Sequence, residues 1–249
     1  MKRIIIKIGT NLLTDNHQRL DLNNMRHLIY QVADEQLKET TYEFIIVSSG
    51  AITSGAKHMN ITPENLAEKQ AAASIGQILL FQKYYEFFQT KNICVGQLLV
   101  TKDNFDDPEK KQNINQTINT LLKNNIIPII NENDSVSTEE IQFGDNDQLS
   151  AILAKNLSVD HLIILTNTDG LLDENNDVIP LLNNISDKEL SLVEDSTSSV
   201  FSKGGMKSKL LAAKIALDAN IKTTIANGRT ENIIHKILSN TTIGTKIQP

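Results

Sequence analysis

Two clusters of acidic and amide side chains in the middle of the sequence could form a polar pocket. The first, NEND at residues 131–134, follows an apolar run at residues 126–130, and the second, GDND, covers residues 144–147. The apolar run is typical of a buried strand of a parallel sheet. A helix is predicted to start at Leu149, so both clusters should lie at the carboxyl edge of that sheet. Acidic and amide groups there would suit an amino-acid substrate or a metal ion.

Lys7 could bring positive charge to the same edge. It lies near the end of an otherwise apolar strand predicted at residues 3–8, where an ammonium group is costly to bury unless it is paired. Gly9 follows it, and a glycine lets a ligand approach the backbone closely. A salt bridge to a nearby carboxylate, or a lysine head that reaches solvent, would also explain Lys7.

Lys209 could bind phosphate from a different part of the chain. It lies in the first turn of a helix predicted at residues 206–219, after Gly204 and Gly205. A phosphate at this helix N-terminus would meet free backbone N–H groups, the helix dipole and the ammonium groups of Lys207 and Lys209. An ordinary loop-to-helix junction with solvated lysines is the alternative. Phosphoryl transfer needs mainly positioning and charge neutralisation, which both lysine regions together could supply.

Two common nucleotide-binding motifs are absent. A dinucleotide fingerprint needs Gly-x-Gly-x-x-Gly after the first strand, whereas residues 8–11 contain only Gly9. Residues 50–57 come near a P-loop, but the lysine is one position late and no hydroxyl residue follows it. Arginine is scarce, so phosphate charge would be met by lysine.

Predicted strands and helices alternate along the chain, which is typical of a mostly parallel sheet covered on both faces. Strands are expected at residues 3–8, 43–47, 93–100, 126–130, 161–165, 222–226 and 244–247. Helices are expected at residues 22–37, 63–89 with Thr62 as N-cap and Pro63 at the first position, 108–124, from Leu149, 187–193, 206–219 and 231–238. We expect one domain with two lobes over residues 1–249.

Composition and charge exclude several other classes of protein. The net charge is −6 with acids and bases interspersed, which argues against a nucleic-acid surface. No apolar run is long enough to cross a membrane, and Lys7 and Gly9 interrupt the apolar N-terminus before it could form a signal peptide. Cys94 is the only cysteine, which excludes an internal disulfide and favours a reducing cytoplasm. The histidines lack metal-ligand spacing, so no protein-built metal site is expected.

Six segments fall in the order found in the glutamate 5-kinases of the amino acid kinase family, which the sequence resembles over essentially its whole length. They are KIGT at residues 7–10, VSSGAI at 47–52, QAAASIGQ at 70–77, NEND at 131–134, GDND at 144–147 and GGM at 204–206. The resemblance implies a three-layer α/β/α sandwich with a mostly parallel central sheet. About residues 1–155 would bind L-glutamate and about residues 156–249 would bind ATP.

The reaction that the resemblance implies is phosphorylation of a side-chain carboxylate. ATP, with Mg²⁺ held largely by its phosphates, would phosphorylate L-glutamate to L-glutamyl 5-phosphate in the first step of proline biosynthesis. Lys7 and Lys209 would flank the transferred group, and Asp147 would hold them in place. The implied substrate-binding residues are Ser49, Gly50, Asp134, Asp145 and Asn146. The implied nucleotide-binding residues are Lys7, Gly9, Thr166, Asn167, Lys203, Gly204, Gly205, Met206, Lys207, Ser208 and Lys209.

Some positions depart from the pattern of the family. Asn167 stands where an aspartate is usual, Leu172 where a tyrosine is common, and Lys203 where a threonine is common. Ser208 replaces a threonine and keeps the hydroxyl group. These differences concern nucleotide affinity and base preference more than the reaction. The sequence also ends where many relatives add a C-terminal PUA-type domain, so a form lacking that domain is expected.

Regulation and assembly are further expectations from the resemblance. Proline would inhibit by competing near the glutamate pocket, and residues 135–143 would form a hairpin lid over the substrate. The helix at about residues 65–89 carries an apolar stripe broader than one core-facing side, so part of it could pack on another subunit. Burial under a neighbouring loop is the alternative, but the family forms dimers and tetramers, which favours a homo-oligomer.

Two other functions remain open on the sequence alone. The chain could phosphorylate a different carboxylate or a carbamate, although Asp134 and Asn146 favour a substrate with a free ammonium group. It could also be a non-catalytic sensor of amino acid and nucleotide, although binding alone would not need both Lys7 and Lys209.

Overall fold

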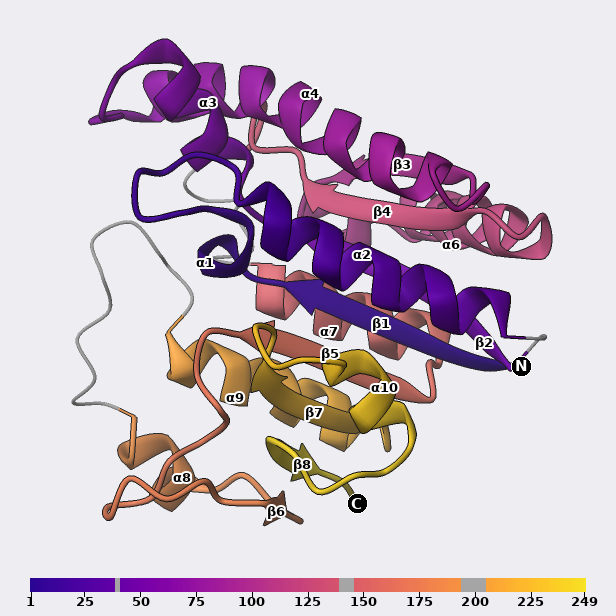
Figure 1. Cartoon of the computed structure of the whole chain (residues 1–249), viewed down its shortest axis with the longest axis vertical. Coiled ribbons are helices and arrows are strands. Elements are labelled where there is room, and N and C mark those ends of the chain that lie inside the picture. The colour runs from indigo at the N-terminus through magenta and orange to yellow at the C-terminus, as the bar shows by residue number, and fades with distance from the viewer. Residues whose placement is uncertain (39–40, 139–145, 194–204) are drawn as a thin grey trace.

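The computed structural model describes residues 1–38, 41–138, 146–193 and 205–249 (Figure 1). An eight-stranded sheet forms its middle layer. In spatial order the strands are β3 (Val95–Val100), β4 (Ile127–Glu132), β2 (Tyr42–Ser48), β1 (Lys2–Ile8), β5 (His161–Thr166), β7 (Lys222–Asn227), β8 (Thr245–Ile247) and β6 (Leu181–Leu182). Among these strands, only the pair β7–β8 is antiparallel. The predicted mostly parallel sheet is therefore confirmed.

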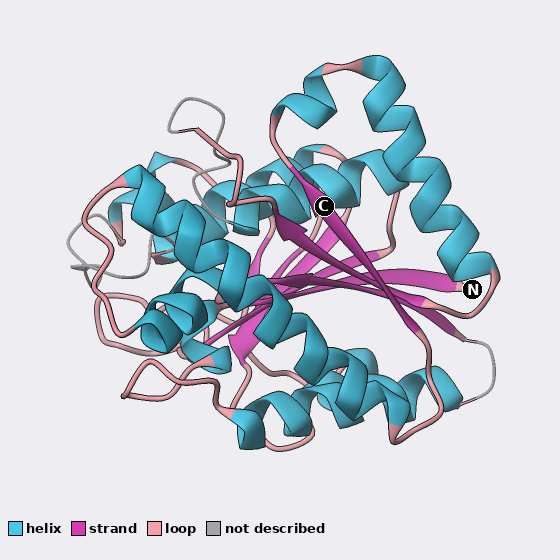
Figure 2. Ribbon diagram, turned by 90° about the horizontal axis from the view of Figure 1, so that it is seen from above, coloured by secondary structure: helices cyan, strands magenta, loops and turns pink. Residues whose placement is uncertain are grey.

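Helices cover both faces of the sheet, as Figure 2 shows. They are α1 (Thr10–Leu13), α2 (Leu22–Leu37), α3 (Ala51–Met59), α4 (Leu66–Gln89), α5 (Asp103–Asp106), α6 (Pro108–Lys123), α7 (Asn146–Leu157), α8 (Asp187–Ser191), α9 (Met206–Asp218) and α10 (Ile233–Leu238). Apolar residues of α6, α7 and α9 pack on one face of the sheet, and those of α1, α2, α4 and α10 pack on the other. The three-layer sandwich is confirmed.

The alternation of side chains along β1 divides its residues between these two layers. Ile4 and Ile6 face the α2 and α10 side, whereas Ile5 faces the α7 and α9 side. Because successive side chains of a strand point to opposite faces, Lys7 shares the face of Ile5. The strand therefore delivers its single buried charge toward α7 and α9 rather than toward α2.

Two predicted helix starts were wrong by three residues, and α10 begins two residues after the predicted start at residue 231. Helix α4 begins at Leu66 rather than at Pro63, because the side chain of Asn65 caps it by accepting from the backbone N–H of Glu68 at 3.0 Å. Helix α7 begins at Asn146 rather than at Leu149. Its first turn therefore contains Asn146 itself, together with Asp147.

Helix α3 was not predicted, and it explains the segment that comes near a P-loop. Gly50, with φ 98°, occupies the left-handed conformation that precedes the helix. Gly55 packs so tightly on α4 that an added Cβ would lie 1.7 Å from the carbonyl oxygen of Ala72, and the facing Gly76 would meet Ala51 O at 1.8 Å. Gly55 thus serves close contact between two helices.

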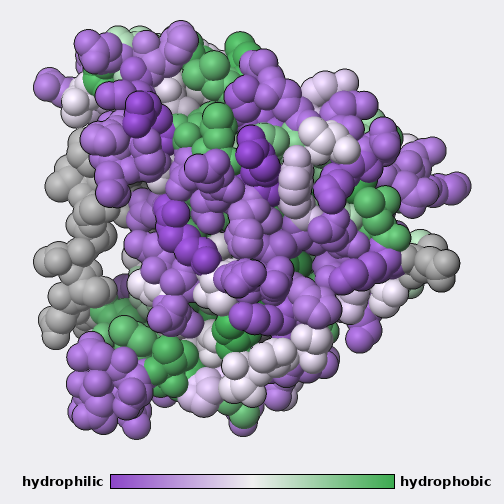
Figure 3. Space-filling view, viewed as in Figure 1, coloured by the Kyte–Doolittle hydropathy of each residue, from purple (hydrophilic) through white to green (hydrophobic). Residues whose placement is uncertain are grey.

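Some large apolar side chains are exposed on the described surface. The face in Figure 3 is mainly hydrophilic, with scattered hydrophobic areas. None of the helices in the described part of the chain is both long enough and apolar enough to cross a membrane. Half of the apolar stripe on α4 is buried within the chain itself, namely Leu80, Tyr84, Phe87 and Phe88, whereas Ile78 and Tyr85 are 70% and 50% exposed.

Candidate active site

A buried cluster of three charged side chains lies at the carboxyl end of β1. The Nζ of Lys7 is 2.6 Å from Oδ1 of Asp147, and the Nζ of Lys209 is 3.1 Å from Oδ2 of the same carboxylate. The exposed fractions of Lys7, Asp147 and Lys209 are 3%, 0% and 5%. The three residues come from β1, from the first turn of α7 and from the first turn of α9. The cluster holds one more positive than negative charge, which suits an anionic ligand.

The charge state of Asp147 follows from this arrangement. Burial on its own would raise the pKa of the carboxyl group, but the attraction of Lys7 and Lys209 and their hydrogen bonds outweigh it, so the pKa lies below its ordinary value. Asp147 is therefore ionised at neutral pH. A carboxylate that remains charged between two ammonium groups fixes their positions.

Small residues surround the charged cluster. A Cβ added at Gly9 would lie 3.7 Å from the Nζ of Lys7, so a side chain there would occupy the space beside the ammonium group. On α9, the hydroxyl of Ser208 donates to Oδ2 of Asp147 at 3.5 Å, and Lys209 Nζ donates to the carbonyl of Gly205 at 3.5 Å. The start of α9 is thus tied to the first turn of α7.

A second, uncharged network begins at the residue next to Asp147. The Nδ2 of Asn146 donates to the backbone oxygen of Ser48 at 2.8 Å, to Oγ of Ser49 at 3.1 Å and to Oδ1 of Asn131 at 2.8 Å. The Nδ2 of Asn131 in turn donates to Oε1 of Gln77 at 2.7 Å. These bonds join α4, the ends of β2 and β4, and α7. We call this set, Gln77, Asn131, Asn146 and Ser49, the amide network.

The NEND segment is shaped by a turn that follows β4. The N–H groups of Val136 and Ser137 both donate to the carbonyl of Asn133, at 3.1 Å each. Ser137 donates to Oε1 of Glu132 at 3.3 Å, and Gln70 of α4 donates to the Ser137 carbonyl at 3.1 Å. This turn places Asp134 at the carboxyl edge of the sheet, partly exposed.

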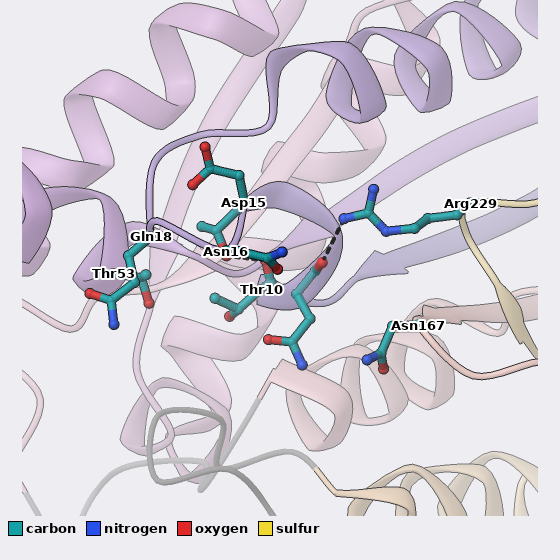
Figure 4. A pocket seen from close by; sticks show the side chains of 9 residues that line it. Thr10, Asp15, Asn16, Gln18, Thr53, Asn167 and Arg229 are labelled. Carbon is teal, nitrogen blue, oxygen red and sulfur yellow. Dashed lines mark hydrogen bonds between the residues drawn. The ribbon is translucent and has the colours of Figure 1, made fainter.

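The predicted nucleotide residues after β5 lie beside the charged cluster in the sheet. Thr166 is buried at the end of β5, which pairs with β1 through Leu165 and Ile8. Asn167 is exposed and lines a cavity of about 320 Å³. Figure 4 shows this cavity, whose lining residues are Thr10, Asn11, Thr14, Asp15, Asn16, Gln18, Thr53, Asn167 and Arg229.

Arg229 supplies a fixed cation at one side of this cavity. Its Nη1 is 3.1 Å from Oδ2 of Asp21, and its Nη2 donates to the backbone oxygen of Asn11 at 3.2 Å. These contacts tie the loop after β7 to the segment that follows β1. The cavity is lined by Thr10 and Asn11, which follow Gly9, so it lies at the same carboxyl end of β1 as the charged cluster.

The structure thus brings several predicted residues together. Lys7, Asp147 and Lys209 form one group, with Gly9, Gly205 and Ser208 adjacent, and Ser49 contacts Asn146. Gly50 adjoins Ser49, while Met206 is partly buried and Lys207 is exposed in the first turn of α9. Leu172 is 36% exposed. Asp145, Lys203 and Gly204 lie outside the described residues, as does most of the predicted hairpin lid at residues 135–143.

Sequence reasoning missed the parts played by Gln77, Asn131 and Arg229. The signal for Gln77 is present in QAAASIGQ, because Gln70 and Gln77 are seven residues apart and so lie on one side of a helix that is otherwise small and apolar. Nothing in the sequence around Arg229 marks it, since its partners Asp21 and Asn11 lie at the other end of the chain.

Metal binding by the protein can be tested against the donor set. Within the described residues, no group of three or more His, Cys, Asp or Glu side chains is placed to hold a metal ion. Asp147 is committed to two lysines. A divalent cation at this site would therefore need oxygen ligands other than the Asp147 carboxylate.

Comparisons with known proteins identify the family of the chain. The model of the amino acid kinase family matches residues 2–227. The chain is 40% identical over 255 residues to a glutamate 5-kinase of Caldanaerobacter subterraneus subsp. tengcongensis, covering 99% of this chain and 68% of that protein. It is 38% identical over 254 residues to the glutamate 5-kinase of Aliivibrio fischeri, with coverage of 99% and 68%.

A solved structure shows the same fold at much lower identity. The crystal structure of UMP kinase from Ureaplasma parvum matches with a TM-score of 0.67 and 16% identity, covering 100% of both chains. The resemblance to glutamate 5-kinases expected from the motifs is confirmed by the curated relatives. The chain belongs to the amino acid kinase family.

Proposed function

We propose that this chain is a glutamate 5-kinase, which transfers the γ-phosphoryl group of ATP to the side-chain carboxylate of L-glutamate and forms L-glutamyl 5-phosphate, the first step of proline biosynthesis. The observation that carries the proposal is the buried Lys7–Asp147–Lys209 cluster beside the amide network. The identity of 40% to a named glutamate 5-kinase supports the choice of substrate.

The charged cluster would act on the transferred group. The γ-carboxylate of glutamate attacks the phosphorus in line, and the ammonium groups of Lys7 and Lys209 stabilise the charge on the phosphoryl oxygens. No general base is needed, because a carboxylate is already ionised at neutral pH. Asp147 keeps both lysines in place without contacting the substrate.

The residues around the amide network would bind L-glutamate. Ser49 and Asn146 offer a hydroxyl and a carboxamide at the ends of β2 and α7, and Asp134 would meet the substrate ammonium. Gly50 and Asp145 complete this set. Residues up to about 155 would thus form the glutamate lobe and residues from about 156 the ATP lobe, although the sheet runs through both.

The nucleotide would lie over the second lobe. Thr166, Asn167 and the loop at residues 203–209 would bind ATP, with Lys207 and the N-terminus of α9 near its phosphates. Bound Mg²⁺ would neutralise phosphate charge. Because Asn167 replaces an aspartate and Leu172 a tyrosine, nucleotide affinity and base preference are where this chain should differ from its relatives.

Three finer features complete the proposal. Proline would compete with glutamate, since both are α-amino acids. A homo-oligomer is supported by Ile78 and Tyr85, which are both exposed and seven residues apart on one side of α4. A reducing cytoplasm suits the free Cys94, which is exposed.

The test is formation of an acyl phosphate. With ATP and Mg²⁺ present, L-glutamate should give a product that hydroxylamine traps as the hydroxamate, and one ADP should appear for each hydroxamate. Aspartate and N-acetylglutamate are the comparison substrates. Activity with either of them but not with glutamate would show a kinase of different specificity, and tight binding of ATP and glutamate without ADP release would show a sensor.

A further inference from the structure

The orientation of the Asn146 carboxamide is fixed by backbone groups that cannot reverse their polarity. The backbone N–H of Glu132 donates to Oδ1 of Asn131 at 2.9 Å, so that atom must be the oxygen. The nitrogen of Asn131 then faces Oε1 of Gln77, and the Asn131 oxygen takes a further bond from Nδ2 of Asn146. The Ser48 carbonyl, which can only accept, holds the same Nδ2 at 2.8 Å.

In this orientation the two N–H donors of the Asn146 side chain are bonded to the protein, and its carboxamide oxygen can accept a hydrogen bond from a ligand. Nδ2 has two hydrogens and three protein acceptors around it, whereas Oδ1 is shielded from solvent and has no partner among the described residues. A buried acceptor without a donor is unfavourable by about 1–3 kcal/mol. A ligand that brings a hydrogen-bond donor to this oxygen therefore gains binding energy, and a ligand that brings another acceptor does not.

Gln77 is the outer partner in this chain of bonds, and it accepts the hydrogen bond from the amide nitrogen of Asn131. It is 9% exposed, and Asn131 is 1% exposed, so water does not readily replace either partner. Gln77 sits on α4, which the tight Gly55–Gly76 contact holds against α3. Its Oε1 can only accept, so it accounts for the donor side of Asn131 and leaves the oxygen side for Asn146.

We propose that Gln77 is a positioning residue that determines substrate specificity: through Asn131 it holds Asn146 with the carboxamide oxygen available, so that the pocket selects an acid with a hydrogen-bond donor, the ammonium group of an α-amino acid. This inference rests on the proposed function. It adds that the preference for substrates with an ammonium group depends on Gln77, a side chain that does not contact the substrate.

The experiment compares L-glutamate with glutarate, the same dicarboxylate without the ammonium group. Gln77→Met removes the acceptor at nearly constant volume. It should raise the KM for glutamate about tenfold and lower the preference for glutamate over glutarate in kcat/KM about tenfold, the scale of one hydrogen bond to a charged group. The KM for ATP should stay within about twofold. Gln77→Glu keeps an acceptor for Asn131 and should retain most of the preference.

Gln82→Met is the matched control, because Gln82 lies on the same helix and its side chain bonds only to exposed Glu86 in the described part of the chain. It should leave both quantities unchanged. An unaltered preference in Gln77→Met, or equal increases in the KM for glutamate and for ATP, overturns the proposal. If Gln77→Met does not fold, Gln77→Leu, which also removes the acceptor, must show the loss of preference instead.

The outcome can be separated from the proposed function itself. If the unmodified chain forms no hydroxamate from glutamate, the proposed function fails. Calorimetric affinities of glutamate and glutarate then still test Gln77, since a preference for glutamate that falls in Gln77→Met supports its positioning role and one that persists refutes it.

Discussion

Asn146 and Asp147 are neighbours in the first turn of α7, yet Asp147 belongs to a cluster of charged side chains and Asn146 to a network of neutral hydrogen bonds. Asp147 is fully buried between two ammonium groups. Asn146 belongs to an uncharged network in which each partner is a carbonyl, a hydroxyl or an amide. Consecutive residues of a helix point about 100° apart, so one turn of helix can serve both regions without mixing them.

The difference indicates that the charged cluster serves catalysis and that the amide network serves substrate selection. Charges held in a buried place interact strongly with charge that develops on a transferred group. A neutral network cannot do that, but it can fix which atom of an amide meets the substrate. Damage to the charged cluster should therefore lower kcat and stability, whereas damage on the amide side should change KM and specificity.

Asp147→Asn should have the largest effect. It leaves two buried ammonium groups without a carboxylate, and removing one partner of a buried pair costs about 3–5 kcal/mol of the free energy of unfolding. We expect kcat to fall at least about a hundredfold, since neither lysine would stay in place. Urea unfolding and the hydroxamate assay measure the two effects.

The pH dependence gives the control for this variant. The pKa of Asp147 is depressed in the folded chain, so its stabilising contribution is complete above the ordinary aspartate pKa of about 3.9 and is lost as the pH falls through the depressed value. The difference in unfolding free energy between the unmodified chain and Asp147→Asn should shrink over that acid range. A difference independent of pH would show that Asp147 is not stabilised as a carboxylate.

Lys209→Ala comes next and tests the catalytic half of the comparison. Loss of one donor to the developing charge should lower kcat by about 10² or more. Lys214→Ala is the control, because Lys214 is an exposed lysine of the same helix. If kcat is unchanged and only the affinity for ATP falls, Lys209 binds the ground state and does not stabilise the transition state.

Asp134→Ala should have the smallest effect on turnover and tests the recognition half. Loss of the carboxylate that meets the substrate ammonium should raise the KM for L-glutamate about tenfold with kcat nearly retained. Asp106→Ala, an exposed acid in α5, should change neither constant. An unaltered KM in Asp134→Ala would place Asp134 outside the pocket, and a large fall in kcat would remove the proposed division between the two regions.

The sheet and most helices could be predicted because their signals are local. The strands at the positions of β1, β2, β4 and β5 are apolar runs, and α2, α6 and α9 show the periodicity of a helix with one buried side. The wrong start predicted for α4 also has a local cause. Thr62 and Asn65 are both residue types that favour the N-cap position, so the sequence pattern did not distinguish between them. Helix α3 was missed because its packing depends on glycines that face another helix.

The sequence by itself determined the order of the motifs, the alternation of strands and helices, and the delivery of polar groups to one edge of a parallel sheet. These three features follow from the order of residues along the chain and from the periodic spacing of apolar residues alone. Only the tertiary structure decided that one carboxylate lies between Lys7 and Lys209, with Asp147 and Lys209 separated by 62 residues. It also decided the polarity of Asn146, because that depends on two backbone groups from separate strands, the Ser48 carbonyl and the Glu132 N–H. Hydrogen-bond direction is set by partners in space, and no local pattern of residues encodes it.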